Sequence, residues 1–174
     1  GVGHLTLIDL DDVCVTNVNR QLHALDGEIG KSKVAVMAER IRRIQPDCEI
    51  VELEQFFTVE TADELLSPGY DFLVDAIDSL ANKALLVSEC RKRGIQAITC
   101  GGAGGKRDST AVKVADLGSA TNDKLLRMLR KKLRREFGYS RDEEEPFGIA
   151  SVFSVENAVF PWSDGQVCTV SEPG

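Results

Sequence analysis

The sequence has few of the residues that build metal centres and cross-linked scaffolds. It contains two histidines and five scattered cysteines in 174 residues, and no two cysteines form a CxxC pair. The sequence therefore indicates neither a zinc knuckle nor a disulfide framework. An odd number of dispersed thiols fits a reducing compartment, so we expect a cytoplasmic protein.

Long apolar runs and an excess of positive charge are also absent. No apolar run approaches the roughly 20 residues of a membrane span, and no segment resembles a signal peptide, so we expect no membrane partner. The net charge of −7 argues against indiscriminate nucleic-acid binding but leaves room for a local basic patch. The apolar fraction of 43% is ordinary for a globular protein. We expect residues 1–174 to form one domain.

The ends of the chain suggest a piece of a longer protein. The first apolar strand is reached within four residues of Gly1, and the chain stops at "SEPG" without a clear closing element. We therefore expect further sequence at both ends.

Apolar periodicity predicts strands and helices that alternate along the chain. Strands are expected at 5–9, 49–55, 70–78, 95–100 and 111–117, and helices at 30–46, 59–66, 80–93 and 124–138. Central strands without polar alternation, joined by helices, indicate an α/β fold with a doubly wound, mostly parallel, Rossmann-like sheet. Ligands bind such sheets beyond the carboxyl ends of the strands.

Carboxylates follow two of the predicted strands at that edge. Asp9 closes the first strand and could accept the ribose hydroxyls of a nucleotide. Asp75 and Asp78 in "DAIDS" end a later strand and could hold a magnesium ion bound to phosphates. Each acid could instead cap a helix or a turn, and both interpretations stay open at this point.

Two cations follow the first strand. The planar guanidinium of Arg20 suits bidentate contact with phosphate. Lys33 lies in the first turns of the helix predicted at 30–46, where the helix amino end already favours anions. Plain surface charge is the alternative for Lys33.

The glycine-rich stretch "GGAGG", residues 101–105, looks like a phosphate loop but lacks its context. A phosphate loop joins a strand to a helix, whereas "AVKVADL" reads as another strand. We expect these small residues to allow a tight turn and close backbone approach.

The segment 124–138 is an amphipathic, strongly basic helix in an acidic protein. Its leucines line one face, and cations cover much of the rest. One interpretation is contact with the phosphates of a nucleic acid, and the other is a solvated helix face. The nucleic-acid interpretation assigns this contact to Arg127, Arg130, Lys131 and Arg134.

Taken together, these polar positions resemble the ThiF/MoeB/HesA superfamily of ATP-dependent adenylating enzymes, relatives of the ubiquitin-activating enzymes. The pattern is Asp9-x-Asp11, Asn17-x-x-Arg20-Gln21, Lys33 and Asp75-x-x-Asp78. The segments "LIDLDDVCVTNVNRQLHAL", "GKSKVAVMAERI", "DAIDS" and "TCGGAGG" are similar to the branch that dehydrates threonylcarbamoyladenosine in tRNA. Compared with that family, the chain lacks the first strand and the glycine-rich phosphate loop, so we expect turnover from the longer protein rather than from this chain alone.

The resemblance implies roles for single residues. Asp9 and Asp11 would lie at the ATP site, with Asp9 on the ribose. Asn17 and Arg20 would contact the phosphates, with Arg20 reaching the pocket of a dimer mate, and Lys33 would neutralise phosphate charge. Arg20 would therefore act both in binding and in catalysis.

The resemblance also implies the chemistry. Asp78 would hold Mg²⁺ and is the residue most closely tied to adenylation. A carboxylate on the tRNA nucleoside would be activated as an acyl-adenylate, and ring closure would expel AMP, with net loss of water. Expected partners are tRNA, a second copy of the chain in a homodimer, and sulfur-transfer proteins.

Three alternatives remain. A related enzyme would adenylate the carboxyl terminus of a ubiquitin-like sulfur-carrier protein, but the paired CxxC zinc ligands often found in such enzymes are absent from this sequence. An NAD(P)-dependent oxidoreductase would also use Asp9, although Arg20 and Lys33 suit a triphosphate better. A non-catalytic dimerisation module would not need all of these polar positions.

Overall fold

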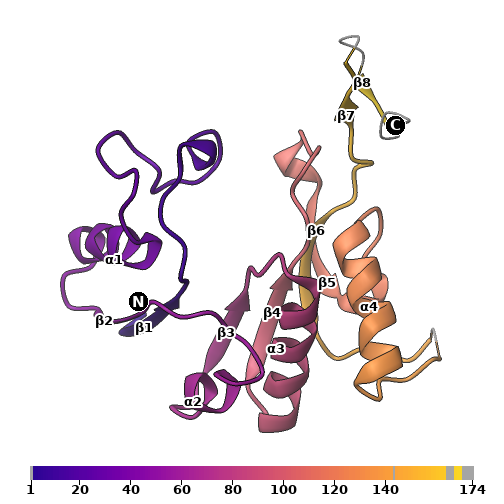
Figure 1. Ribbon diagram of the computed structural model, residues 1–174. Coiled ribbons are helices and arrows are strands. Elements are labelled where there is room, and N and C mark those ends of the chain that lie inside the picture. Colours follow the sequence, from indigo (N-terminus) through magenta and orange to yellow (C-terminus); the bar gives the residue numbers. More distant parts are fainter. Residues whose placement is uncertain (1, 143, 164–166, 170–174) are drawn as a thin grey trace. The chain divides into compact units, whose positions relative to one another are not determined.

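The computed structural model describes residues 2–142, 144–163 and 167–169. The chain divides into two compact units, Gly1–Phe57 and Thr58–Gly174 (Figure 1). The expectation of one domain over 1–174 stays a prediction.

The first unit is a strand–helix–strand arrangement. Its elements are β1 (His4–Ile8), the short 3-10 helix η1 (Val15–Asn17), α1 (Lys33–Ile44) and β2 (Glu49–Leu53). β1 and β2 are parallel, in a register that places His4 opposite Glu49. Helix α1 buries Val34 and Ala38. It ends two residues before Pro46, because proline cannot continue a helix.

The second unit contains a four-stranded sheet in the order β3-β4-β6-β5. β3, β4 and β6 run parallel to one another, and β5 runs antiparallel to β6. β7 and β8 pair with each other in antiparallel orientation. The elements are α2 (Ala62–Leu66), β3 (Phe72–Asp75), α3 (Leu80–Arg93), β4 (Gln96–Cys100), η2 (Ser109–Ala111), β5 (Val112–Asp116), η3 (Leu117–Ser119), α4 (Lys124–Glu136), β6 (Ala150–Ser154), β7 (Phe160–Pro161) and β8 (Val167–Cys168).

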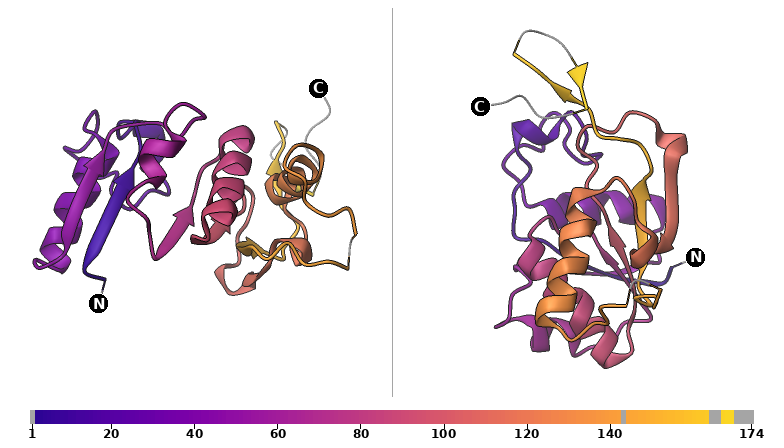
Figure 2. Two further views of the ribbon diagram at one scale, coloured as in Figure 1. Left: turned by 90° about the horizontal axis from the view of Figure 1, so that it is seen from below. Right: turned by 90° about the vertical axis from the view of Figure 1, so that its right-hand side faces the viewer.

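Helices α3 and α4 pack side by side over one face of this sheet (Figure 2). The leucine stripe of α4 is fully buried at Leu126, Leu129 and Leu133. These side chains share one apolar core with Val87 of α3 and Phe153 of β6. The amphipathic pattern of 124–138 thus marks the core-facing side of α4.

The opposite face of the sheet is exposed at several apolar side chains. Val74 on β3 is 65% exposed, and Val114 on β5 is also 65% exposed. The apolar centre of the strand predicted at 70–78 is typical of burial on both faces of a sheet. The described helices of the second unit cover only one of the two faces of this sheet.

The predicted α/β fold with a mostly parallel sheet is confirmed, with two differences. Strand β6 was not predicted, because serines interrupt the apolar pattern of "ASVFS"; Ser151 and Ser154 are nevertheless buried. β5 is antiparallel because residues 101–111 contain no α-helix that could serve as a parallel crossover. In the described part of the chain, no helix is long and apolar enough to cross a membrane.

Candidate functional site

The carboxylate of Asp9 lies at the carboxyl end of β1, as predicted. Its Oδ1 accepts the backbone N–H of Asp11 at 2.8 Å, and its own N–H donates to the carbonyl of Leu53 on β2 at 3.2 Å. One carboxylate oxygen therefore shapes the turn after the strand. Asp9 is half-buried, so the carboxylate is both anchored and accessible.

Lys33, at the first position of α1, forms an ion pair with Asp11 at 2.7 Å. The lysine side chain is 13% exposed, whereas that of Asp11 is 56% exposed. Two backbone bonds hold the same segments together, because Lys33 N–H donates to Asp11 O and Val13 N–H donates to Lys31 O. The start of α1 is thus tied to the residues that follow β1, and the ammonium group is kept near them.

Asn17 and Arg20 lie in the loop between β1 and α1. The buried side chain of Asn17 accepts the backbone N–H of Cys14 at 3.0 Å. Arg20 is exposed, and its Nη1 donates to the carbonyl of Thr16 and to Asn19 Oδ1. Asn17 therefore builds the loop from inside, while the guanidinium of Arg20 lies at the surface. All five predicted residues lie in the first unit, and contacts join Asp9, Asp11 and Lys33 in one group and Asn17 and Arg20 in another.

The two acids of "DAIDS" lie in the second unit and have different surroundings. Asp75 is 1% exposed, and its Oδ2 binds Lys83 Nζ at 2.8 Å. Asp78 is exposed, in the segment between β3 and α3. Among the described residues, no hydrogen bond or ion pair occupies the carboxylate of Asp78. Of the two acids, only Asp78 is therefore available to a ligand.

The described residues hold no cluster of three or more histidine, cysteine or acidic side chains that would form a preformed metal site. Mg²⁺ does not need one, because it commonly takes one or two carboxylates together with waters and substrate phosphates. A single exposed carboxylate at a strand end fits that manner of binding.

The glycine-rich loop after β4 is tightly packed, and η2 and β5 follow it, as predicted. A side chain at Gly101 would place its Cβ 2.1 Å from Asp123 Oδ2, and one at Gly105 would meet the carbonyl of Val159 at 2.5 Å. Gly105 also has a φ of +74°. Close backbone approach therefore explains these two glycines.

Asp123 connects this loop to helix α4. One of its carboxylate oxygens accepts the N–H of Leu126 and caps the helix, and the other accepts the N–H of Gly102 at 2.9 Å. A cavity of about 380 Å³ lies beside the loop, between the ends of β4 and β6 and the start of β5; Cys100, Arg107 and Val152 are among the residues that line it. This cavity is at the sheet edge where α/β proteins bind ligands.

The four cations predicted to contact nucleic acid divide into two pairs. Arg127 and Lys131 are exposed on α4. Arg130 donates to the carbonyls of Leu117 and Ala120 at 3.0 and 2.9 Å. The side chain of Arg130 thus stabilises the backbone before α4, a role that helical spacing did not predict.

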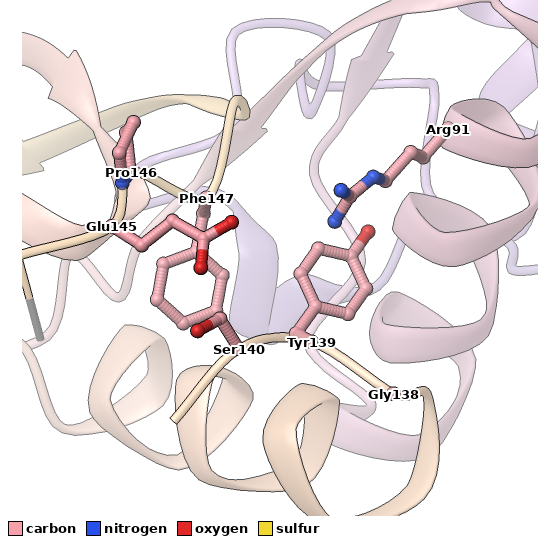
Figure 3. Close-up of a pocket in the computed structure, with 7 residues that line it drawn as sticks. All are labelled: Arg91, Gly138, Tyr139, Ser140, Glu145, Pro146 and Phe147. Atoms are coloured by element: carbon pink, nitrogen blue, oxygen red, sulfur yellow. The ribbon is translucent and has the colours of Figure 1, made fainter. Parts of the chain in front are cut away.

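Arg134 also supports the fold. Its Nε donates to the carbonyl of Ser140 at 3.0 Å, and its guanidinium lies 5.1 Å from the centroid of the Phe147 ring. Phe147 stacks on Tyr139, and the guanidinium of Arg91 lies 4.5 Å from the centroid of the Tyr139 ring (Figure 3). Each ring is therefore packed against the other ring and against one arginine.

Sequence reasoning missed three polar residues that organise this unit. They are Lys83, Lys106 and Asp123. The side chain of Lys106 donates to the carbonyls of Asn122, Ser154 and Glu156. A signal existed for Lys83, since it lies in the apolar stripe of α3 next to Ala84.

The cysteines predict a contrast in reactivity. The Thr16 hydroxyl donates to the exposed Cys14 thiol at 3.3 Å and lowers its pKa. Burial, with the charge of Asp75 adding to it, raises the pKa of Cys90 to about 11. Because the thiolate is the nucleophile, we expect iodoacetamide at pH 8 to modify Cys14 and leave Cys90 intact, as read by peptide mass spectrometry.

Two controls accompany this prediction. Thr16→Val should slow modification of Cys14, and urea should make Cys90 react. Equal rates at Cys14 and Cys90 in the folded protein would contradict the described burial.

An anchored carboxylate at the end of a parallel strand, with a lysine at the start of the next helix, defines a candidate nucleotide site of an α/β protein. The chain belongs to the ThiF family, whose model matches residues 1–144. It is 45% identical to the tRNA threonylcarbamoyladenosine dehydratase of Escherichia coli (strain K12), over 98% of this chain and 63% of that relative.

Solved structures agree with this similarity. A structure described as TcdA (CsdL) matches with a TM-score of 0.92 and 46% identity, covering 96% of this chain and 66% of that one. E. coli TcdA in complex with ATP matches with a TM-score of 0.88 and 45% identity, covering 91% of this chain and 65% of that one. The chain thus spans somewhat less than two thirds of the length of these relatives.

Proposed function

We propose that the protein containing this chain dehydrates threonylcarbamoyladenosine in tRNA, with ATP as the activating substrate. The observation that carries the proposal is the 45% identity, over 98% of this chain, to an E. coli protein named for that activity. The anchored Asp9 and Lys33 at one strand end, and the exposed Asp78 at another, supply polar groups that such a reaction needs.

ATP binding is assigned to the first unit. Asp9 accepts hydrogen bonds from the ribose, and Lys33 lies at the amino end of α1, where helix dipole and ammonium both favour phosphate. Asp11 keeps the ammonium group in place through its ion pair. Arg20 is exposed and supplies a bidentate donor to phosphate oxygens. An E. coli relative has been solved in complex with ATP, which supports ATP as the ligand.

The magnesium ion is assigned to Asp78. When bound, Mg²⁺ would offset the negative charge that develops on the phosphates during adenylation. The carboxylate of Asp78 is exposed and is not engaged by any other described residue, so it can accept a metal–phosphate complex without breaking an existing contact.

The chemistry needs activation, because hydroxide is a poor leaving group from a carboxylate. A carboxylate oxygen of the threonylcarbamoyl group attacks the α-phosphorus of ATP, and the bond to pyrophosphate breaks. An internal nucleophile of the same group then attacks the acyl carbon, loses its proton and expels AMP. The sum is loss of one water from the nucleoside. This sequence of steps needs no enzyme thiol. Burial raises the pKa of Cys100, which disfavours its thiolate form.

The test uses the complete gene product that contains this chain. It is incubated with ATP, Mg²⁺ and tRNA bearing threonylcarbamoyladenosine, and the digested nucleosides are weighed. A nucleoside lighter by one water, formed only with ATP, supports the proposal. An unchanged nucleoside despite ATP binding would favour adenylation of the carboxyl terminus of a sulfur-carrier protein.

We further propose that α4 contacts tRNA through its exposed cations. Reversing Arg127 and Lys131 together to glutamate should weaken tRNA binding by about tenfold or more at low salt and flatten its salt dependence, because fewer counterions are released. The measurement is a filter-binding titration over a range of salt concentrations. Arg130 and Arg134 are left intact because they hold backbone carbonyls.

The matched control reverses Lys113 and Arg141, two exposed cations of the same unit outside α4. It changes the net charge equally. If both double variants lose the same affinity, the effect is one of overall charge, and α4 is a solvated helix face.

We propose that the protein acts as a homodimer. The loop between β1 and α1 exposes a set of apolar side chains that a second copy would cover, namely Leu10, Val15, Val18, Leu22, Leu25 and Ile29. We expect Leu22→Glu to shift the gene product from dimer to monomer in light scattering. A wild-type protein that is monomeric at micromolar concentration would contradict the proposal.

A further inference from the structure

Three polar side chains form a closed network in the interior of the second unit. Lys83 Nζ, on α3, donates to Asp75 Oδ2 at 2.8 Å and to Thr99 Oγ1 at 3.1 Å. The Thr99 hydroxyl, on β4, donates in turn to Asp75 Oδ2 at 2.7 Å. The side chains of Lys83 and Asp75 have no exposed surface, and Thr99 is fully buried. The network thus links β3, α3 and β4.

A buried ion pair of this kind contributes little net free energy to the stability of a fold. Removing two charges from water costs free energy that their attraction only partly returns, and well-packed apolar residues often do as well or better. One recognised use of buried ion pairs is to specify a single local arrangement. The backbone segments next to the network are therefore the parts of the fold whose arrangement it could specify.

The first such segment carries Asp78. The other oxygen of Asp75, Oδ1, accepts the N–H of Ile77 at 2.9 Å. On the far side, the N–H of Lys83 donates to the carbonyl of Ser79 at 2.9 Å. Asp78 stands between Ile77, which the Asp75 carboxylate holds, and Ser79, which begins the first turn of the helix that carries Lys83.

The second segment is the glycine-rich loop. Thr99 is followed by Cys100 and Gly101, which line the cavity of about 380 Å³ at the carboxyl end of β4. Thr99 lies opposite Asp75 in the parallel register of β3 and β4. The network is thus placed just below two neighbouring strand ends, those that lead to Asp78 and to the cavity.

We propose that Asp75, Lys83 and Thr99 are positioning residues that hold Asp78 where it can take up the metal–ATP complex. The inference rests on the proposed function for the identity of that ligand. Asp78 itself has no side-chain partner among the described residues, so its direction depends on the backbone of 76–79, and that backbone depends on the network.

Thr99→Val is the sharpest variant, because it keeps the shape of the side chain and the Asp75–Lys83 pair but removes the shared hydroxyl. Thr99→Ser restores that hydroxyl. Ser151→Ala is the matched control. Ser151 lies opposite Thr99 on β6, is equally buried, and donates to the carbonyl of Ala115 rather than to the network.

Two measurements on the complete gene product separate positioning from stability. The first is amide hydrogen exchange of 76–79, which reports local opening of the segment. The second is the affinity for Mn²⁺ with ATP, measured by electron paramagnetic resonance. We expect Thr99→Val to speed exchange and weaken Mn²⁺ binding about tenfold or more, as loss of supporting contacts around metal ligands does. Thr99→Ser should recover both, and Ser151→Ala should change neither.

The outcomes are distinct. Unchanged exchange in Thr99→Val, or an equal change in Ser151→Ala, overturns the positioning role. Faster exchange with unchanged Mn²⁺ affinity overturns its link to the metal. If the wild-type protein binds no Mn²⁺ with ATP, the magnesium assignment of the proposed function fails, and the link between the network and the metal fails with it. If the wild-type protein binds Mn²⁺ and Thr99→Val binds it equally well, only the positioning inference is overturned.

Discussion

Asp78→Ala is expected to lower adenylation by about 10³-fold or more without unfolding the protein. The magnitude follows from the several kcal/mol that metal-held charge stabilisation contributes to phosphate chemistry. The fold should survive because the carboxylate of Asp78 is exposed and bonds to no other described residue. The loss should therefore appear in the chemical step and in metal affinity rather than in stability.

The measurement is exchange of labelled pyrophosphate into ATP, driven by tRNA that bears threonylcarbamoyladenosine, with thermal unfolding measured in parallel. Asp71→Ala serves as the control, because Asp71 is exposed just before the same strand, at its amino end. Normal exchange by Asp78→Ala would remove Asp78 from the magnesium site. An equal loss in Asp71→Ala would indicate a general effect of charge.

Lys83→Met is expected to lower the free energy of unfolding by about 3–5 kcal/mol. It leaves the carboxylate of Asp75 buried without its cation, and an uncompensated buried charge costs more than the pair contributes. The expected loss is a large fraction of the stability of an ordinary domain. Equilibrium unfolding in urea measures it, provided that the variant is folded without denaturant.

Two further variants make the result interpretable. Lys92→Met removes a lysine from the same helix that is 64% exposed. Its partner, Glu89, also lies within ion-pair distance of Arg93. The variant should change stability little, because pairs made by an exposed lysine contribute little. Asp75→Leu combined with Lys83→Met removes both charges and should be more stable than Lys83→Met alone. If the double variant is no better, the cost lies in packing rather than in the unpaired charge.

The helices and most strands could be predicted from the sequence because their signals are local. The apolar stripe of 124–138 reappears as the buried face of α4, and proline at position 46 follows the end of α1. Strand β6 escaped prediction because Ser151 and Ser154 look like surface residues in one dimension. They are buried where tertiary contacts supply their partners: Ser151 donates to the carbonyl of Ala115, and Ser154 donates to the carboxylate of Glu156.

The sequence by itself determined the α/β class, the strand ends that Asp9 and Asp78 follow, and the packing role of Gly101 and Gly105. These follow from periodicity, from proline and glycine, and from the position of acids after apolar runs. Only the tertiary structure decided which of two similar residues is available. Asp75 and Asp78 are three residues apart, yet one is enclosed with Lys83 and the other is exposed, because burial depends on what α3 and β4 bring against each position. Arg130 and Lys131 are adjacent, yet only Arg130 reaches backbone carbonyls, because its place on the helix turns it toward the fold.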